Sequence, residues 1–253
     1  MATVGLLHPG EMGAAIGRVL RDRGHDVLWA SSERSKATSQ RAAAAGLTDV
    51  LSVEALGEQS DVILSVCPPH AAMEVARATL ASPALLVDAN AIAPATARAI
   101  AAERDRSGLV DGGIIGPPPE TSGTTRLYLS GTHASSVAEL FERTPVDARV
   151  LSTNIGDASA LKMTYAAWTK GTAALLLAIQ AVADAEGVEP ALTEEWRLSL
   201  PDLPETLTRA QRSASAKGWR WVGEMEEIAA TFSAAGLPDG FHRAAAEIFR
   251  RSP

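Results

Sequence analysis

The stretch that decides the fold of this chain is Thr3-Val4-Gly5-Leu6-Leu7-His8-Pro9-Gly10-Glu11-Met12-Gly13. Its apolar run predicts a strand, its glycines predict a tight turn, and the residues after the turn predict a helix over 11–22. This order creates an anion site, because a helix N-terminus carries about half a positive charge. We therefore expect a dinucleotide to bind at this turn, with a turn that holds no ligand as the alternative. The residues expected to contact the dinucleotide are His8, Pro9, Gly10, Glu11, Met12 and Gly13, where His8 stands in the place of the first glycine of G-x-G-x-x-G.

Short apolar runs alternate with alanine-rich stretches from residue 3 to about 154. This rhythm is typical of a Rossmann-type α/β fold, in which a doubly wound, mainly parallel sheet is covered on both faces. We expect strands at 3–8, 26–31, 61–67, 84–89, 108–111, 125–130 and 148–152. We expect helices at 11–22, 35–45, 70–81, 94–104 and 135–143.

The pattern changes after Gly156, where residues 158–186 predict one long helix followed by several shorter ones. We therefore expect a Rossmann domain at 1–155 and an all-helical domain at 156–253, joined by the long helix. Four of the five tryptophans lie in the second domain, and we expect them to pack its helices together. The long helix carries one apolar stripe, formed by Leu161, Tyr165, Trp168, Leu175, Ile179 and Val182.

Composition excludes several classes of protein. The 253 residues carry a net charge of −7 and no basic cluster, which argues against nucleic-acid binding. We expect no membrane segment, because the strongly apolar run at 173–179 is far shorter than the roughly 20 residues that a span needs. A single cysteine, Cys67, and the absence of a leader predict a cytoplasmic protein. The five histidines show no metal-ligand spacing, so no metal site is expected.

The end of the second expected strand indicates which dinucleotide binds. An acidic residue usually holds the free ribose 2′-hydroxyl of NAD at this point, whereas a 2′-phosphate calls for hydroxyls and an arginine. Ser31 and Ser32 stand in the place of the acid, and Arg34 follows them. The sequence therefore favours NADP over NAD. The alternative is a solvated Arg34, with Ser31 capping the next helix.

Further segments carry a family resemblance, and they are Val66-Cys67-Pro68-Pro69, Asp88-Ala89-Asn90-Ala91, the run from Asp111 to Gly116 and the run from Gly156 to Lys162. With the first turn, they make the whole chain resemble the β-hydroxyacid dehydrogenase superfamily, which includes 3-hydroxyisobutyrate dehydrogenases and 6-phosphogluconate dehydrogenase. The C-terminal runs 218–227 and 235–242 resemble a bacterial branch with a short helical second domain.

The resemblance implies roles for these segments. Val66, Cys67 and Pro68 would lie along the coenzyme, and Asn90 would hydrogen-bond coenzyme or substrate. Four residues would belong to a loop that binds the substrate carboxylate, although this chain has Ile115-Gly116-Pro117 where the family ends that loop with Ser-Gly-Gly. These residues are Gly112, Gly113, Ile114 and Ile115.

The resemblance also implies an oxidoreductase that moves hydride between nicotinamide and a small hydroxy acid or carbonyl compound. Lys162 matches the family's catalytic lysine, which gives a proton to the substrate oxygen during reduction and removes it during oxidation. Tyr165 replaces a family asparagine, and Thr169, which shares its helix face, is a further candidate for substrate binding. Tyr165 either donates a hydrogen bond to the substrate or only joins the apolar stripe.

Two other functions are open at this point. An imine reductase would use the same fold on a C=N bond. Tyr165 favours it, as does Met225-Glu226-Glu227 in place of a family Lys-Asp pair, whereas Lys162 argues against it, because imine reductases of this family usually lack the lysine. A catalytically silent NADP-binding sensor is suggested by His8 and Ile115. The resemblance further implies a homodimer formed through the helical domain.

Overall fold

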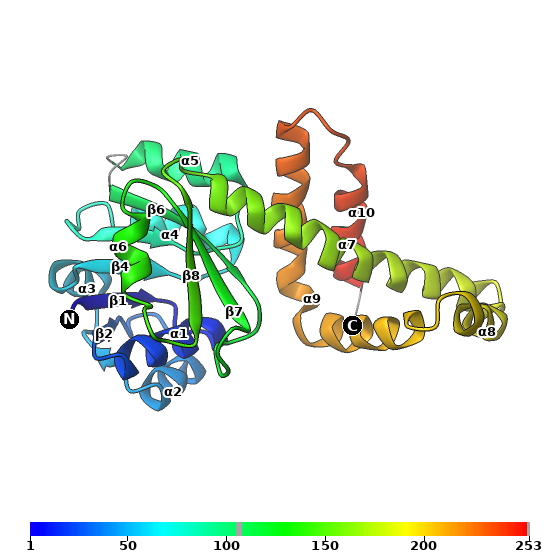
Figure 1. Cartoon of the computed structure of the whole chain (residues 1–253), viewed down its shortest axis with the longest axis horizontal. Coiled ribbons are helices and arrows are strands. Elements are labelled where there is room, and N and C mark those ends of the chain that lie inside the picture. The colour runs from blue at the N-terminus through cyan, green and yellow to red at the C-terminus, as the bar shows by residue number, and fades with distance from the viewer. Residues whose placement is uncertain (105–107, 252–253) are drawn as a thin grey trace. The chain divides into compact units, whose positions relative to one another are not determined.

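The computed structural model describes residues 1–104 and 108–251 (Figure 1). The chain divides into two compact units, Met1–Lys162 and Met163–Pro253. The division falls inside one helix, α7 (Asp157–Ala185). Residues 105–107 and 252–253, which the predicted domain ranges include, lie outside the described residues.

The first unit is built on an eight-stranded sheet with the order β3-β2-β1-β4-β5-β6-β7-β8. Every neighbouring pair is parallel except β6 with β7. The strands are β1 (Thr3–Leu7), β2 (Asp26–Trp29), β3 (Thr48–Asp49), β4 (Val62–Ser65), β5 (Leu85–Asp88), β6 (Leu109–Ile115), β7 (Thr125–Ser130) and β8 (Val146–Ser152). The predicted fold class, a mainly parallel Rossmann sheet followed by a helical domain, is confirmed.

The helices of the first unit cover both faces of this sheet (Figure 1). They are α1 (Glu11–Asp22), α2 (Lys36–Ala44), α3 (Val53–Gln59), the 3-10 turn η1 (Pro69–Ala71), α4 (Ala72–Arg77), α5 (Pro94–Glu103) and α6 (Ala134–Glu139). The two faces follow from the period of two in a strand. Leu6 packs in the core under α1, α2 and α6, whereas its neighbour Leu7 packs in the core under α3, α4 and α5.

The register of the parallel strands brings the carboxyl ends of β1, β4 and β5 level with Asp111, which lies inside β6. Leu7 pairs with Ser65, Ser65 with Asp88, and Asp88 with Asp111. The strand order also reverses between β1 and β4, because β2 and β3 lie on one side and β5 and β6 on the other. Ligands of open α/β sheets bind in the crevice at such a reversal. The segments that leave β1, β4 and β5 therefore meet at one edge.

Two parts of the sequence-based assignment differ from the structure in this unit. The strand predicted at 108–111 continues to Ile115, so residues 112–115 belong to β6 and not to a loop. Antiparallel pairing with β7 holds them there, for example Gly113 with Tyr128. The sequence analysis also missed β3 and α3, because two and seven residues are too few to show a periodic pattern.

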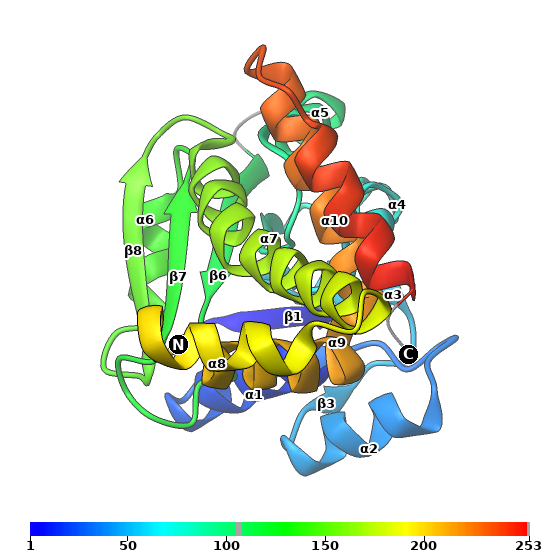
Figure 2. The ribbon, with the colours of Figure 1, turned by 90° about the vertical axis from the view of Figure 1, so that its right-hand side faces the viewer.

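The second unit is helical and contains the C-terminal part of α7 with α8 (Glu189–Ser199), α9 (Leu203–Ala234) and α10 (Gly240–Arg251). The expectation of only shorter helices after α7 was wrong, because α9 runs unbroken for 32 residues. Figure 2 shows α9 and α10 side by side, and Phe249 of α10 meets Trp221 of α9 edge to face at 5.1 Å. Lys170 of α7 forms an ion pair with Glu224 of α9, and both side chains are mostly buried.

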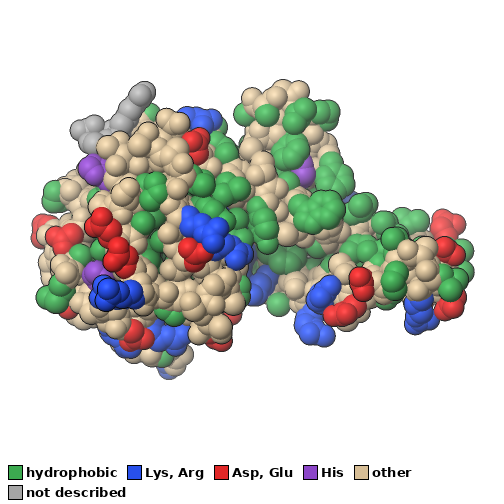
Figure 3. All heavy atoms as spheres, in the orientation of Figure 1, with side chains coloured by type: hydrophobic (Ala, Val, Ile, Leu, Met, Phe, Trp, Pro, Cys, Tyr) green, Lys and Arg blue, Asp and Glu red, His purple; other side chains and the backbone are tan. Residues whose placement is uncertain are grey.

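The apolar stripe predicted on α7 is not the face that this chain buries. Trp168 is 72% exposed and Val182 is 62% exposed, and small residues such as Ala166 and Ala174 form the buried face instead. Among the later tryptophans, Trp196 is buried but Trp219 is 68% exposed. Hydrophobic side chains accordingly gather on the surface of the helical unit (Figure 3).

By length and composition, α7 is also long and apolar enough to cross a membrane, with a third of its most apolar window buried. This differs from the sequence analysis, which measured only an uninterrupted apolar run. Length and hydropathy do not separate a membrane span from a long helix of a soluble fold.

Candidate functional site

The loop between β1 and α1 has the conformation that a glycine would normally supply. His8, which replaces the first glycine of the motif, has φ 61°, in the left-handed region. The amide of Gly10 donates to the His8 carbonyl oxygen at 2.7 Å, which closes the turn. A Cβ at Gly13 would lie 2.7 Å from that same oxygen, so only glycine fits there. A Cβ at Gly10 would meet nothing closer than 3.9 Å, which leaves that side of the loop open.

The start of α1 suits an anionic ligand. No side chain caps this helix at Gly10, and the positive end of a helix dipole attracts an anion. The buried Nδ1 atom of His8 has no hydrogen-bond partner within the described residues. Burial, together with a smaller effect of the positive charge of Arg34, lowers the pKa of His8 to about 4. The ring is therefore neutral near pH 7, and Arg34 lies close enough to the loop to act on it.

The loop after β2 places the predicted NADP residues. The amide of Ser31 donates to Asp49 Oδ1 at 3.2 Å, and the amide of Ser32 donates to the Leu51 carbonyl oxygen at 2.9 Å. Glu33 has φ 60°, which turns the chain before Arg34. Ser35, and not Ser31, caps α2, because its hydroxyl accepts from the Thr38 amide.

The sequence analysis missed Arg41, which reaches from α2 to the coenzyme loop. Its Nε donates to the Pro9 carbonyl oxygen at 3.4 Å, and its Nη2 donates to Thr38 Oγ1 at 3.2 Å. No sequence motif marks this residue. A basic residue in the helix after the second strand is the only signal that pointed to it.

The segments after β4 and β5 are tied to each other by Asn90. Its Oδ1 accepts from the Cys67 amide at 2.5 Å, and its Nδ2 donates to Ser65 Oγ at 3.1 Å and to Asp88 Oδ2 at 3.0 Å. Both amide hydrogens are therefore used within the protein, and only oxygen lone pairs are left for a ligand. Asn90 is 2% exposed, so it shapes this edge of the sheet.

Val66, Cys67 and Pro68 follow β4 at the same edge. Val66 lies beside Gly13, since its Cβ is 3.7 Å from the position that a Gly13 Cβ would take. Pro68 directly precedes the 3-10 turn η1. Burial, together with a smaller effect of the negative charge of Asp88, raises the pKa of the Cys67 thiol to about 12. Cys67 is therefore a neutral thiol near pH 7.

Lys162 lies against β6. Its Nζ donates to the carbonyl oxygen of Ile114 at 2.8 Å. Gly113 makes this approach possible, because a Cβ there would lie 2.9 Å from the Ala158 carbonyl oxygen and 3.0 Å from the Lys162 Cβ. The other predicted substrate residues, Gly112 and Ile115, are buried in the same strand.

A buried carboxylate, which the sequence analysis did not single out, fixes the start of α7. Asp111 is fully buried in β6, where it pairs with Asp88, the last residue of β5. Its Oδ1 accepts from the Ser159 hydroxyl at 2.6 Å, and its Oδ2 accepts from the amides of Gly156 and Ser159 at 2.9 and 3.0 Å. The Ser130 hydroxyl donates to Oδ2 as well, at 3.0 Å. This network holds the helix turn from which Lys162 projects.

Tyr165 and Thr169 belong to the second unit. Tyr165 is 47% exposed, and Thr169 donates its hydroxyl to the Tyr165 carbonyl oxygen at 3.5 Å. Tyr165 is therefore not part of the core of this chain. Its contact with a substrate stays a prediction.

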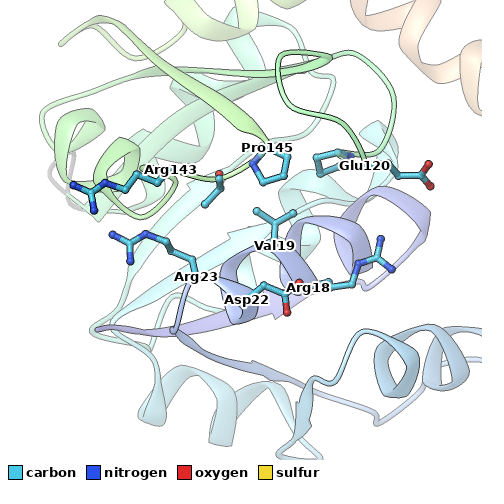
Figure 4. A pocket seen from close by; sticks show the side chains of 9 residues that line it. Arg18, Val19, Asp22, Arg23, Glu120, Arg143 and Pro145 are labelled. Atoms are coloured by element: carbon cyan, nitrogen blue, oxygen red, sulfur yellow. The ribbon is translucent and has the colours of Figure 1, made fainter.

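A cavity of about 700 Å³ lies apart from these residues (Figure 4). Its lining comes from the C-terminal half of α1, from the loop after β6 and from the loop before β8, and it includes Arg18, Arg23 and Arg143. None of the predicted site residues lines it. In residues 1–104 and 108–251, no group of three or more histidine, cysteine, aspartate or glutamate side chains is arranged to hold a metal ion.

Two family models match the chain. The model described as NADP oxidoreductase coenzyme F420-dependent matches residues 3–92, and a domain of unknown function, DUF1932, matches residues 183–252. A 28.5 kDa protein from the 7S RNA 5′ region of Methanothermus fervidus is 28% identical over 192 residues, which is 76% of this chain and 74% of that protein.

Solved structures match almost the whole chain. A conserved protein of unknown function, described as similar to 3-hydroxyacid dehydrogenases, is 28% identical with a TM-score of 0.72, and the match covers 98% of this chain and 96% of the other. A conserved protein from Sinorhizobium meliloti 1021 is 25% identical with a TM-score of 0.72, over 99% and 88% of the two chains. The 3-hydroxyisobutyrate dehydrogenase of Mycobacterium tuberculosis shares the fold at a TM-score of 0.74 and 17% identity, over 99% and 93%.

The fold and the glycine turn are those of a Rossmann-type dinucleotide-binding protein, and the matching NADP oxidoreductase model and the 28% identical structure indicate an oxidoreductase. Within this class, the two family models and the structural matches support the β-hydroxyacid dehydrogenase superfamily, as the sequence resemblance indicated.

Proposed function

We propose that this protein is an NADP-dependent oxidoreductase of the β-hydroxyacid dehydrogenase type, which acts on a small hydroxy acid or carbonyl compound. The observation that carries the proposal is the position of Lys162. Its Nζ lies 2.8 Å from the Ile114 carbonyl oxygen of β6, and β6 pairs with β5, whose carboxyl end lies level with those of β1 and β4 at the candidate coenzyme site. A nicotinamide coenzyme supplies hydride transfer to or from carbon.

Lys162 would move the proton that accompanies this transfer. Its ammonium group has three donors, and the Ile114 carbonyl uses one of them, which fixes the direction of the group. In the proposed mechanism this ammonium group gives a proton to a substrate oxygen as a carbonyl is reduced. The reverse transfer accompanies oxidation of an alcohol.

The proposal is tested by replacing Lys162 with Met. We expect turnover to fall by about 100-fold or more, the usual contribution of a general acid or base, while NADPH binding changes less than about threefold. The assay follows NADPH absorbance with a panel of hydroxy acids, their carbonyl partners and cyclic imines. Lys217→Met, which changes a lysine of α9, is the matched control. Near-normal turnover in Lys162→Met would remove Lys162 from the mechanism.

The same panel separates the two alternatives. A preference for cyclic imines would assign the protein to the imine reductases, and the exposed phenol of Tyr165, three residues beyond Lys162, is the group that favours this activity. Tight NADPH binding without turnover on any substrate would favour the silent sensor.

We also propose a homodimer that forms through the exposed face of α7. Tyr165, Trp168, Leu175 and Val182 are each at least 46% exposed and recur on one stripe. An apolar stripe of this kind is a typical protein interface, and a second copy related by a twofold axis can cover it with the same residues. Light scattering should give a dimer mass for the wild type and a monomer mass for Trp168→Glu. Leu51→Glu, at a 69% exposed position of the first unit, should stay dimeric. A monomeric wild type would overturn the proposal.

A further inference from the structure

We infer that Arg41 binds the 2′-phosphate of NADP together with Arg34 and thereby contributes to selection of NADP over NAD. The inference rests on the proposed function, because it concerns the coenzyme of that site, but it assigns a residue that neither the glycine motif nor the end of β2 contains.

The guanidinium of Arg41 bridges two segments that surround the adenosine end of a Rossmann site. Its Nε donates to the Pro9 carbonyl oxygen in the loop after β1, at 3.4 Å. Its Nη2 donates to Thr38 Oγ1 in the first turn of α2, at 3.2 Å. In this fold the adenosine ribose lies between the first strand-to-helix turn and the end of the second strand. Arg41 therefore faces the position of the ribose 2′ substituent.

The bridge is held in place by a chain of hydroxyls. Thr38 Oγ1 lies 3.0 Å from Ser35 Oγ, and Ser35 Oγ accepts from the Thr38 amide at 3.2 Å. Ser35 is the N-cap of α2, so this helix start, the hydroxyls and the guanidinium form one connected unit. A guanidinium that is fixed before binding loses less conformational entropy when a phosphate arrives.

The charge of Arg41 is available to a ligand. Both of its partners in the described part of the chain, a carbonyl and a hydroxyl, are uncharged. These contacts use two of its five N–H donors, and three remain. Arg34 adds a second positive charge, and its effect on the His8 pKa shows that this charge reaches the same loop. Two arginines match a phosphate dianion, whereas the 2′-hydroxyl of NAD offers them no charge.

The test compares coenzymes that differ only at the 2′ position. We expect Arg41→Gln to weaken NADPH binding by about 10- to 100-fold, the usual effect of one charge-assisted hydrogen-bonded contact, and NADH binding by less than threefold. Arg41→Lys keeps the positive charge but loses the planar guanidinium, so its affinity for NADPH should lie between those of the wild type and Arg41→Gln. Fluorescence titration measures both coenzymes, and calorimetry repeats the comparison with 2′,5′-ADP and 5′-AMP. Arg18→Gln, on α1, is the matched control.

Three outcomes would overturn the inference. An unchanged NADPH affinity in Arg41→Gln would show that the guanidinium does not meet the phosphate. An equal loss for NADPH and NADH would show that Arg41 only shapes the Pro9 loop. If Arg34→Ala removes the NADPH preference and Arg41→Gln does not, the proposed function stands and this inference fails. A wild type that binds neither coenzyme refutes the proposed function itself.

Discussion

Removal of the Asp111 carboxylate should destabilise the first unit severely. Four donors at 2.6 to 3.0 Å converge on this buried group, two from hydroxyls and two from backbone amides. In Asp111→Ala these donors are left in a protein interior without an acceptor. At about 1 kcal/mol for each orphaned donor, the free energy of unfolding should fall by about 4 kcal/mol. This is a large fraction of the roughly 5–15 kcal/mol by which a typical domain is stable.

Urea unfolding followed by far-ultraviolet circular dichroism measures this loss. Asp147→Ala is the matched control, because Asp147 pairs with Arg149 on the surface and such pairs contribute less than about 1 kcal/mol. Asp111→Asn should fall between the two variants, since the amide oxygen still accepts while the NH₂ group faces the Ser159 hydroxyl. A loss in Asp111→Ala no greater than in the control would refute the view that this carboxylate anchors α7.

Three other predictions concern the candidate site. His8 has a pKa of about 4 in the folded chain against 6.5 for the unperturbed group, so the unfolded state takes up the proton first and stability falls as the pH drops below 6.5. The free energies of unfolding at pH 7 and pH 5 should therefore differ by about 2 kcal/mol more in the wild type than in His8→Asn. Equal differences in the two proteins would contradict this prediction. Cys67, with its pKa raised to about 12, should react with iodoacetamide at pH 8 at least about 100-fold more slowly in the native protein than in urea, and similar rates would exclude a buried thiol. In Gly113→Ala the added methyl would lie 2.9 Å from the Ala158 carbonyl oxygen and 3.0 Å from the Lys162 Cβ. The free energy of unfolding should fall by about 1–3 kcal/mol, and turnover should fall because Lys162 is displaced. An unchanged melting temperature and turnover would show that α7 can move away freely.

Local patterns in the sequence predicted the elements that local rules determine. The helix predicted at 11–22 has these bounds in α1, because a glycine turn precedes it and Gly24, with φ 101°, follows it. The edge at which β1, β4 and β5 end also followed from the alternation of strands and helices. In contrast, the pairing of residues 112–115 with β7 could not be predicted, because two glycines inside a strand look like a turn.

The apolar stripe of α7 shows a second limit. Periodicity identified the apolar side chains correctly, but it does not tell whether the same chain or another molecule covers them. Trp168 is largely exposed, whereas alanines form the buried face. Arg41 and Asp111 were missed for a similar reason. Arg41 hydrogen-bonds to Pro9, 32 positions before it, and the partners of Asp111 lie at least 19 positions after it in the sequence. No short motif records partners at such separations.

The left-handed backbone of His8 has a consequence for how such proteins are recognised. The turn requires a conformation, and glycine is only the residue that adopts it most easily; histidine, asparagine and aspartate also enter this region more often than other side chains. Searches that demand glycine at the first position of the motif will pass over chains with these substitutions. A search pattern that admits them would recover coenzyme loops that a strict glycine rule discards.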